Sequence, residues 1–375
     1  MAIEKLYDDI RPYLDSEVSE VLSRLQRNTD LLNFLGQWRY PLLFRLSPRL
    51  ARIPISIFLK RKLGRIKSVR GFQDVVYHYV THIIKETTSN FEYSGIENLD
   101  PKKSYLFVSN HRDIAGDSML LDYALYTSGL DTVRIAVGDN LVQIGFATDL
   151  MKLNKSFIIK RSEEGAKKVY SALLKSSQYI HDSLSEGQSV WIAQSEGRAK
   201  DGMDLTEPAI IKMFTLAKRK QKFSDLIRQL NIVPMAISYE YDPCDVQKAL
   251  ELTTIANDGA YIKPRGEDLA NLVRGLGGFK GRVALKIGKP LTSNFSSAHD
   301  VAREIDRQIK ENLVLFPINH WAYSQLAGEK KPIDTDFSDY FSERLSACPE
   351  EARPYFLRMY AVSYTHLTLP TNREV

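Results

Sequence analysis

The spacing of apolar residues changes near Asn90 and separates two kinds of structure. Over residues 15–87, apolar residues recur every three or four positions, which is typical of amphipathic helices. The first of these helices contains Val18, Val21, Leu22 and Leu25. Beyond Asn90, apolar runs of strand length alternate with helical stretches, as in α/β domains. We therefore predict a helical N-terminal region followed by an α/β domain whose mixed sheet is flanked by helices.

The predicted elements suggest domain boundaries along the chain. Strands are predicted at residues 105–109, 133–137, 156–159, 189–193, 232–238 and 282–287. The clearest helices are predicted at residues 165–184, 208–220 and 302–313. The expected domains are a helical region at 1–90, an α/β domain at 91–325 and a C-terminal extension at 326–361. Residues 362–371, VSYTHLTLPT, look like the translation of a sequencing-library adapter, so residues 362–375 are predicted to be a non-native tail.

Positive charge is concentrated in one part of the helical region. The formal net charge of the chain is +5, but the stretch between Leu31 and Gln73 has ten basic residues and no acidic one. The basic residues are Arg39, Arg45, Arg49, Arg52, Lys60, Arg61, Lys62, Arg65, Lys67 and Arg70. The rest of the chain is therefore net negative.

Large apolar side chains, such as Trp38 and Leu42, are interleaved with these cations. This combination suits an anionic lipid surface, where each Lys or Arg contributes about 1 kcal/mol and apolar groups enter the interface. A solvated basic face on helices that pack against the rest of the protein gives the same pattern. A nucleic-acid groove is disfavoured because no recognition motif for DNA or RNA accompanies the charge. Pro41, Pro48 and Pro54 are predicted to divide the segment into short helices.

Three features bear on the expected location. The first residues, MAIEKLYDDI, lack the apolar run of a secretory signal. Mostly apolar stretches, such as residues 53–59 and 232–237, are shorter than the roughly 20 residues of a transmembrane helix. Two cysteines, Cys244 and Cys348, indicate a reducing compartment rather than a disulfide framework or a metal site. We expect a peripheral or monotopic protein on the cytoplasmic face of a membrane.

A histidine and two carboxylates follow the predicted strand at 105–109. The sequence SNHRDIAGDS contains His111, Asp113 and Asp117. A carboxylate at the start of the next helix can hold one imidazole nitrogen and leave the other free, as a general base requires. His111 is therefore the candidate base, with Asp117 or Asp113 as its partner. A loop histidine in a surface hydrogen bond would give the same pattern.

Three later blocks add candidates for binding an anionic substrate. The block KSFIIKR ends a predicted strand with Lys160 and Arg161. The block QSEGR ends another strand, where Gly197 permits close backbone approach and Arg198 can bind a phosphate. Both blocks also fit ordinary solvated strand ends and turns. The block IVPMA carries Pro234, which suits an edge strand or a pocket wall.

Taken in order, these four blocks resemble the glycerophospholipid acyltransferase family, which includes the 1-acyl-glycerol-3-phosphate acyltransferases. The resemblance covers residues 91–289 and includes GIENL at residues 95–99. It implies an α/β acyltransferase domain behind a membrane-associated region, with no metal and no cofactor besides the donor, acyl-CoA or acyl-carrier protein. The implied reaction moves a fatty acyl group to a hydroxyl of 1-acyl-glycerol-3-phosphate or a related lysophospholipid and makes phosphatidic acid.

The resemblance also implies roles for individual residues. His111 would be the general base, and Asp117 would orient it. The residues implied in binding the acceptor phosphate are Glu196, Gly197 and Arg198, with Arg161 and Lys160 assisting. The implied partners are the phospholipid surface, the lysophospholipid acceptor and, as one of the two donors, acyl-carrier protein, with no nucleic acid.

Two spacings depart from the family pattern. Five residues lie between His111 and Asp117, where the family usually has four, so Asp113 stays open as the partner although Asp117 is favoured. Arg198 follows Gly197 directly, where the family usually places one residue between them. The second departure leaves the identity of the acceptor open.

Several other functions fit less well. The alternatives are transfer to glycerol-3-phosphate or a non-phosphate lipid, and a non-catalytic lipid-binding protein at the membrane. The chain has no G-x-S-x-G element and no P-loop, which disfavours a serine lipase and a nucleotide hydrolase. The block GLGGFK, residues 275–280, resembles a dinucleotide-binding loop, but Lys280 occupies the third glycine position and a predicted strand follows. We interpret this block as a flexible connection.

Overall fold

The computed structural model describes residues 6–142, 145–203, 205–264, 266–329 and 338–368. The chain forms two compact units. Unit 1 comprises residues 1–80 and 134–176, and unit 2 comprises residues 81–133 and 177–375. Helices α6 (Val69–Thr87) and α9 (Ala166–Ser185) each run across a boundary between the units.

Unit 1 combines short helices with a pair of parallel strands. Its helices are α2 (Asp15–Arg27), α3 (Thr29–Arg39), α4 (Pro41–Leu46), α5 (Pro48–Leu63) and α8 (Gly145–Leu153), with a 3-10 turn at Asp139–Val142. Strands β3 (Arg134–Gly138) and β4 (Ser156–Ile159) pair in parallel. The ends of the helices follow local chemistry: Asn28, for example, accepts a hydrogen bond from the backbone N–H of Leu31 at 2.9 Å and caps α3.

The apolar face of α2 forms part of the core of unit 1. Its buried residues are Val18, Val21, Leu22 and Leu25, which is the set that the helical spacing predicted. They pack in one cluster with residues of α5 and with Phe146 and Leu153 of α8. Beside this cluster, Arg24 forms a 2.8 Å ion pair with Asp149.

The prediction that Pro54 ends a helix was wrong, because α5 continues through it. Pro41 and Pro48 do begin α4 and α5, in the first helical position, where a backbone N–H has no partner within the helix. The buried residues of α5 are Ala51, Ile55, Leu59 and Leu63. Their packing offsets the roughly 3 kcal/mol that an internal proline costs a helix. Within the described ranges, no helix combines the length and the apolar character of a bilayer span.

Unit 2 is built on a mixed sheet, which confirms the predicted fold class. Its strands are β1 (Asn90–Ser94), β2 (Leu106–Ser109), β5 (Val190–Ala193), β6 (Ile232–Tyr239) and β7 (Arg282–Ile287). Their order is β1-β7-β6-β2-β5, and neighbouring strands are parallel except for β6 and β7. All four residues of β2 are buried, as expected for a central strand covered on both faces.

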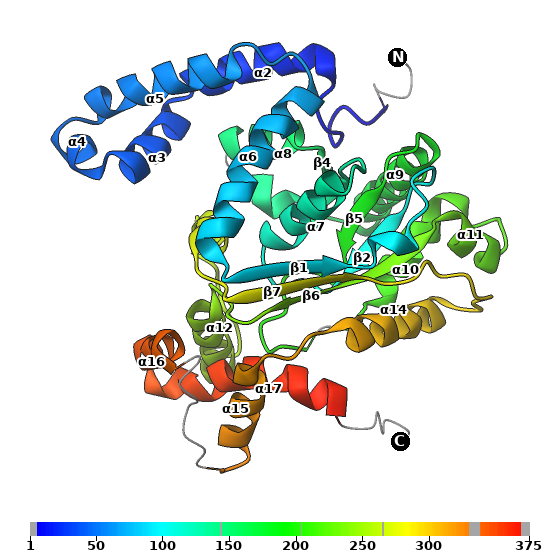
Figure 1. The fold of residues 1–375 in the computed structure, drawn as a ribbon. Helices are drawn as coiled ribbons and strands as arrows, with labels where there is room; N and C mark the ends of the chain where they lie inside the picture. Colours follow the sequence, from blue (N-terminus) through cyan, green and yellow to red (C-terminus); the bar gives the residue numbers. More distant parts are fainter. Residues whose placement is uncertain (1–5, 143–144, 204, 265, 330–337, 369–375) are drawn as a thin grey trace. The chain divides into compact units, whose positions relative to one another are not determined.

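Helices cover both faces of this sheet. The helices that lie wholly within unit 2 are α7 (Gly116–Thr127), α10 (Pro208–Thr215), α11 (Phe223–Gln229), α12 (Asp245–Asp258), α13 (Glu267–Gly277), α14 (Ala298–Asn312), α15 (Pro317–Leu326), α16 (Ser338–Ala347) and α17 (Arg353–Thr368), with 3-10 turns at Ile96–Asn98, Leu216–Lys218 and Glu350–Ala352. Helices α7 and α14 lie on opposite faces (Figure 1). On the α7 side, the ring centroids of Phe91 and Tyr123 are 5.9 Å apart, so α7 packs against β1.

The proposal that Pro234 suits an edge strand was wrong, because β6 lies between β7 and β2. Pro234 is opposite Val108 of β2, and the ladder with β7 begins one residue later, at Met235. The missing N–H of the proline therefore falls before the paired part of the β7 ladder. A small cavity is lined by residues 237–239 of β6, which follow the block IVPMA rather than belong to it.

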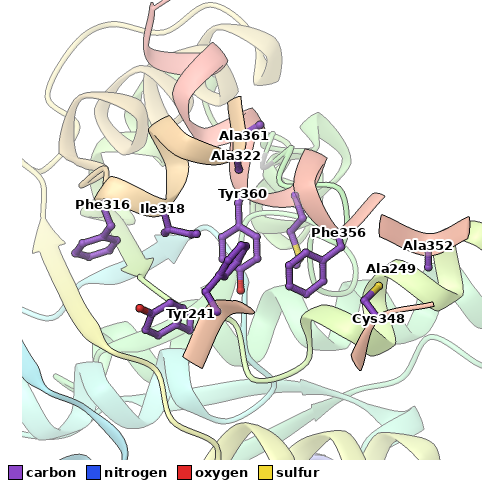
Figure 2. Close-up of a cluster of buried hydrophobic side chains, with 12 residues drawn as sticks. Tyr241, Ala249, Phe316, Ile318, Ala322, Cys348, Ala352, Phe356, Tyr360 and Ala361 are labelled. Atoms are coloured by element: carbon purple, nitrogen blue, oxygen red, sulfur yellow. The ribbon is translucent and has the colours of Figure 1, made fainter. Parts of the chain in front are cut away.

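The C-terminal helices of unit 2 pack in an aromatic cluster with α12. Phe341, Phe356 and Tyr360 have ring centroids 5.4 Å apart in each pair, and Figure 2 shows Phe356, Tyr360 and Tyr241 in the same buried cluster. The Tyr360 hydroxyl donates a 2.7 Å hydrogen bond to Asp245, so α17 is held to the start of α12. The predicted non-native tail at 362–375 begins within α17, and residues 369–375 of it lie outside the described residues.

Candidate active site

The loop after β2 is fixed to the neighbouring strand by a buried side-chain amide. Asn110 donates to the carbonyl of Ile237 at 2.9 Å and accepts from its N–H at 2.8 Å. One residue earlier, the Ser109 hydroxyl accepts a 3.0 Å hydrogen bond from Trp191 Nε1. Because the Asn110 amide bonds to a backbone N–H and a backbone carbonyl of β6, as a neighbouring strand would, it holds the loop at a fixed position on the sheet.

His111 and Asp117 form a hydrogen-bonded pair at the start of α7. The distance between His111 Nδ1 and Asp117 Oδ2 is 2.8 Å. Since an ionised carboxylate only accepts hydrogen bonds, Nδ1 carries the proton and Nε2 is the basic nitrogen. The Asp117 side chain is fully buried, whereas the His111 side chain is 14% exposed. The rings of His111 and Trp191 pack in an edge-to-face arrangement, with centroids 5.8 Å apart.

Asp117 is held by further donors on both of its oxygens. The backbone N–H groups of Arg112 and Asp113 donate to Oδ2 at 2.8 and 3.1 Å. The hydroxyl of Tyr239 donates to Oδ1 at 2.8 Å. Burial of this hydroxyl and the nearby Asp117 charge raise the pKa of Tyr239 well above its ordinary value, so the tyrosine keeps its proton and remains a donor.

Tyr239 is a residue of this site that sequence reasoning missed. It is the last residue of β6, 122 positions after Asp117. The available signal was its place at the carboxyl end of a strand beside β2, because adjacent parallel strands bring such ends together.

Asp113 is not the partner of His111. It is 4% exposed, and its Oδ1 accepts hydrogen bonds from the N–H groups of Ala115 and Gly116 at 3.0 and 2.7 Å. Burial and the charge of Asp117 raise the pKa of Asp113. The structure thus places the two carboxylates of the loop in different positions, with Asp117 against the imidazole.

The loop after β5 joins the histidine loop through its backbone. The N–H of Ala199 donates to the carbonyl of His111 at 2.9 Å. Gly197 has a φ of +76°, which glycine adopts readily, and Glu196 is exposed. Nη1 of Arg198 is buried and has no hydrogen-bond partner among the residues that the structure describes. A guanidinium nitrogen in this condition can donate to an anionic ligand.

Lys160 and Arg161 belong to unit 1, whereas the other predicted site residues belong to unit 2. Lys160 Nζ donates to Asp9 at 2.7 Å, and Lys175 donates to the same carboxylate at 2.7 Å. The backbone N–H of Arg161 donates to Asp139 at 3.1 Å. In unit 1, these residues therefore have structural partners of their own.

The interpretation of GLGGFK as a flexible connection was wrong. Gly275 and Gly277 lie in α13, and Gly275 and Lys280 are buried. The Lys280 ammonium donates to the carbonyl of Gly278 at 2.8 Å. The block therefore belongs to a helix and its buried end, and a Cβ added at Gly275 would meet the carboxylate of Asp113.

Residues 90–238 match the Acyltransferase family of proteins. Curated relatives also match by sequence, and among them are three proteins named glycerol-3-phosphate acyltransferase. The protein of Pseudoalteromonas translucida is 29% identical over 180 residues, which are 48% of this chain and 20% of the relative. That of Pseudoalteromonas atlantica is 29% identical over 160 residues, 40% of this chain and 19% of the relative. That of Colwellia psychrerythraea is 24% identical over 191 residues, 50% of this chain and 22% of the relative.

The matched region thus spans about a fifth of the length of these relatives. Among solved structures, the 1-acyl-sn-glycerophosphate acyltransferase of Thermotoga maritima matches with 15% sequence identity and a TM-score of 0.37. That match covers 78% of this chain and 92% of the other.

The hydroxyl of Tyr239 is predicted to stabilise the fold through Asp117. Tyr239→Phe leaves one oxygen of a buried carboxylate without its donor, so we expect the free energy of unfolding to fall by about 1–3 kcal/mol. Urea unfolding followed by circular dichroism measures the change.

Tyr241→Phe is the matched control. Tyr241 is also buried, but its hydroxyl has no hydrogen-bond partner within the described part of the chain. Equal unfolding free energies for Tyr239→Phe and the unmodified protein would show that the bond to Asp117 contributes nothing.

Proposed function

We propose that this chain, a member of the glycerophospholipid acyltransferase family, moves a fatty acyl group from a thioester donor to a hydroxyl of a glycerophosphate. The pairing of His111 with the buried Asp117 is the observation that carries the proposal. It leaves Nε2 as the basic nitrogen of a partly exposed imidazole, next to a loop that contains an arginine with an unpaired donor. A non-catalytic lipid-binding protein would have no use for this arrangement.

The proposed mechanism is direct transfer between the two substrates. Nε2 of His111 takes the proton of the acceptor hydroxyl while its oxygen attacks the thioester carbonyl. Asp117 stabilises the imidazolium that forms. The tetrahedral intermediate then collapses, the carbon–sulfur bond breaks, and the imidazolium returns the proton to the departing thiolate. The products are the ester and the free thiol, and no acyl-enzyme forms.

The proposed acceptor carries a phosphate. The buried, unpartnered Nη1 of Arg198 supports an anionic ligand at this end of the sheet. Curated relatives named glycerol-3-phosphate acyltransferase favour glycerol-3-phosphate, and 1-acyl-glycerol-3-phosphate is the second candidate. The donor is acyl-CoA or acyl-carrier protein, and the reaction as written needs no further cofactor.

The proposed partner of unit 1 is the surface of a phospholipid membrane. Three large apolar side chains of α3 and α4 are exposed: Trp38 by 74%, Leu42 by 74% and Leu46 by 84%. The neighbouring Arg39 and Arg45 are also solvent-exposed. Apolar groups that enter the acyl boundary, beside cations at the level of the headgroups, favour an anionic interface. We infer peripheral or monotopic attachment, at the cytoplasmic face.

The proposed chemistry predicts a loss of turnover when the imidazole is removed. Since general base catalysis contributes about 10²- to 10⁴-fold, His111→Ala should lower kcat by at least about 10²-fold. Thiol release from acyl-CoA and from acyl-carrier protein, each with glycerol-3-phosphate or 1-acyl-glycerol-3-phosphate, measures it. An unchanged melting temperature shows that the fold is intact.

His299→Ala serves as the matched control, because His299 is exposed on α14. It should turn over as the unmodified protein does. Near-normal turnover by His111→Ala, or the absence of acyl transfer from every donor and acceptor pair, would refute the proposal.

The membrane proposal predicts that the exposed apolar residues of α3 and α4 drive vesicle binding. Replacing Trp38, Leu42 and Leu46 together by serine should weaken binding to phosphatidylglycerol vesicles by at least about tenfold, because each substitution removes an apolar side chain that would enter the lipid interface. Co-sedimentation measures it, with phosphatidylcholine vesicles as the uncharged comparison. Ile262→Ser is the control, because Ile262 is 90% exposed but lies in unit 2. Equal binding by the triple variant would exclude this surface.

A further inference from the structure

Asp113 is a buried carboxylate that the proposed mechanism does not use. It lies on the loop between His111 and Asp117, and its side-chain carboxylate bonds to neither of these side chains. Both hydrogen bonds to its Oδ1 come from the backbone at the start of α7, from Ala115 and Gly116. These N–H groups belong to the first turn region, where a helix lacks internal acceptors. The carboxylate therefore fixes the chain immediately before Asp117.

The five residues between His111 and Asp117 make a loop that has to fold back on itself. The N–H of Asp113 donates to Asp117 Oδ2 at 3.1 Å, while the side chain of Asp113 holds Gly116. The two aspartates thus bond across the same turn in opposite directions. This crossing brings the carboxylate of Asp117 back to His111 Nδ1 at 2.8 Å.

Helix α13 approaches the side chain of Asp113 closely at Gly275. A Cβ added at Gly275 would lie 2.1 Å from Asp113 Oδ2, much closer than two such atoms can approach. A Cβ added at Gly116 would lie 3.0 Å from the other carboxylate oxygen, Asp113 Oδ1. Lys280, which is 1% exposed, supplies a buried positive charge that interacts with Asp113. Residues well beyond the matched segment 90–238 therefore determine where this carboxylate sits.

We propose that Asp113 is a positioning residue that holds the loop in the conformation in which Asp117 pairs with His111. Gly275 leaves the space that the Asp113 carboxylate occupies. Asp113 touches no substrate and acts only through Asp117. The inference deepens the proposed acyl transfer and rests on it for its effect on turnover. The pairing itself can be tested without turnover.

The test compares Asp113→Ala, Asp113→Asn and Gly275→Ala. A displacement of about 1 Å at a catalytic group can cost about 10²-fold, so Asp113→Ala and Gly275→Ala should each lower kcat about that much, with KM for donor and acceptor little changed. Asparagine keeps an oxygen that accepts both N–H groups, so Asp113→Asn should rescue most of the turnover. Gly277→Ala is the control, because a Cβ at this exposed position of α13 meets nothing within 4 Å.

Proton NMR of the His111 imidazole distinguishes positioning from a general loss of stability. The Nδ1 proton, shared with a buried carboxylate, gives a downfield resonance that is assigned by its absence in His111→Ala. We expect this resonance to be lost in Asp113→Ala and Gly275→Ala, and to persist in Asp113→Asn and Gly277→Ala. The resonance reports on the inference even if no acyl transfer is found.

Two results would overturn the inference. One is unchanged kcat and an unchanged resonance in Asp113→Ala. The other is a fall in turnover that only follows the folded fraction, as measured by thermal unfolding, while the folded molecules keep the resonance. In that second case Asp113 would stabilise the fold without positioning Asp117.

Discussion

The carboxylate of Asp117 is the group on which the site depends. An ionised carboxylate with no exposed surface is costly unless every oxygen is paired. Here the pairing comes from the imidazole of His111, from two backbone N–H groups of the loop and from Tyr239. The loop, the start of α7 and the end of β6 must all be correctly placed for this carboxylate to be buried. The hydrogen bonds that stabilise the buried carboxylate of Asp117 also fix the orientation of the His111 imidazole.

The spacing of apolar residues along the sequence predicted most strands and the buried face of helix α2, because these features depend on neighbouring residues. Each predicted strand lies within one or two residues of an observed one, and the spacing of Val18, Val21, Leu22 and Leu25 identified the buried face of α2. Strand β1 was missed because four of the five residues of NFEYS are exposed, so it has no continuous apolar run. Pro54 and Pro234 were misjudged because packing along α5 and the late start of the β7 ladder are tertiary features.

The candidate site could be predicted only for residues that lie close together in one sequence motif. His111 and Asp117 lie in one short segment, the loop after β2 and the first turn of α7, so their types and spacing suggested the pair. Tyr239 and Gly275 could not be assigned, because each contacts the loop from a distant segment of the sequence. The ammonium of Lys248 in α12 likewise donates to the carbonyl of Arg112 at 2.8 Å. Segments after residue 238 therefore help to hold a loop whose chemistry lies within the matched domain.

The proposed chemistry requires the free nitrogen of His111 to receive the proton of an acceptor hydroxyl. A structure of the protein with glycerol-3-phosphate and a non-reactive thioester analogue of acyl-CoA measures this directly. We expect an acceptor hydroxyl about 2.6–3.2 Å from His111 Nε2, facing the carbonyl carbon of the analogue, with the phosphate on Arg198. An acceptor bound with its hydroxyl away from the imidazole, or with its phosphate away from Arg198, would contradict it.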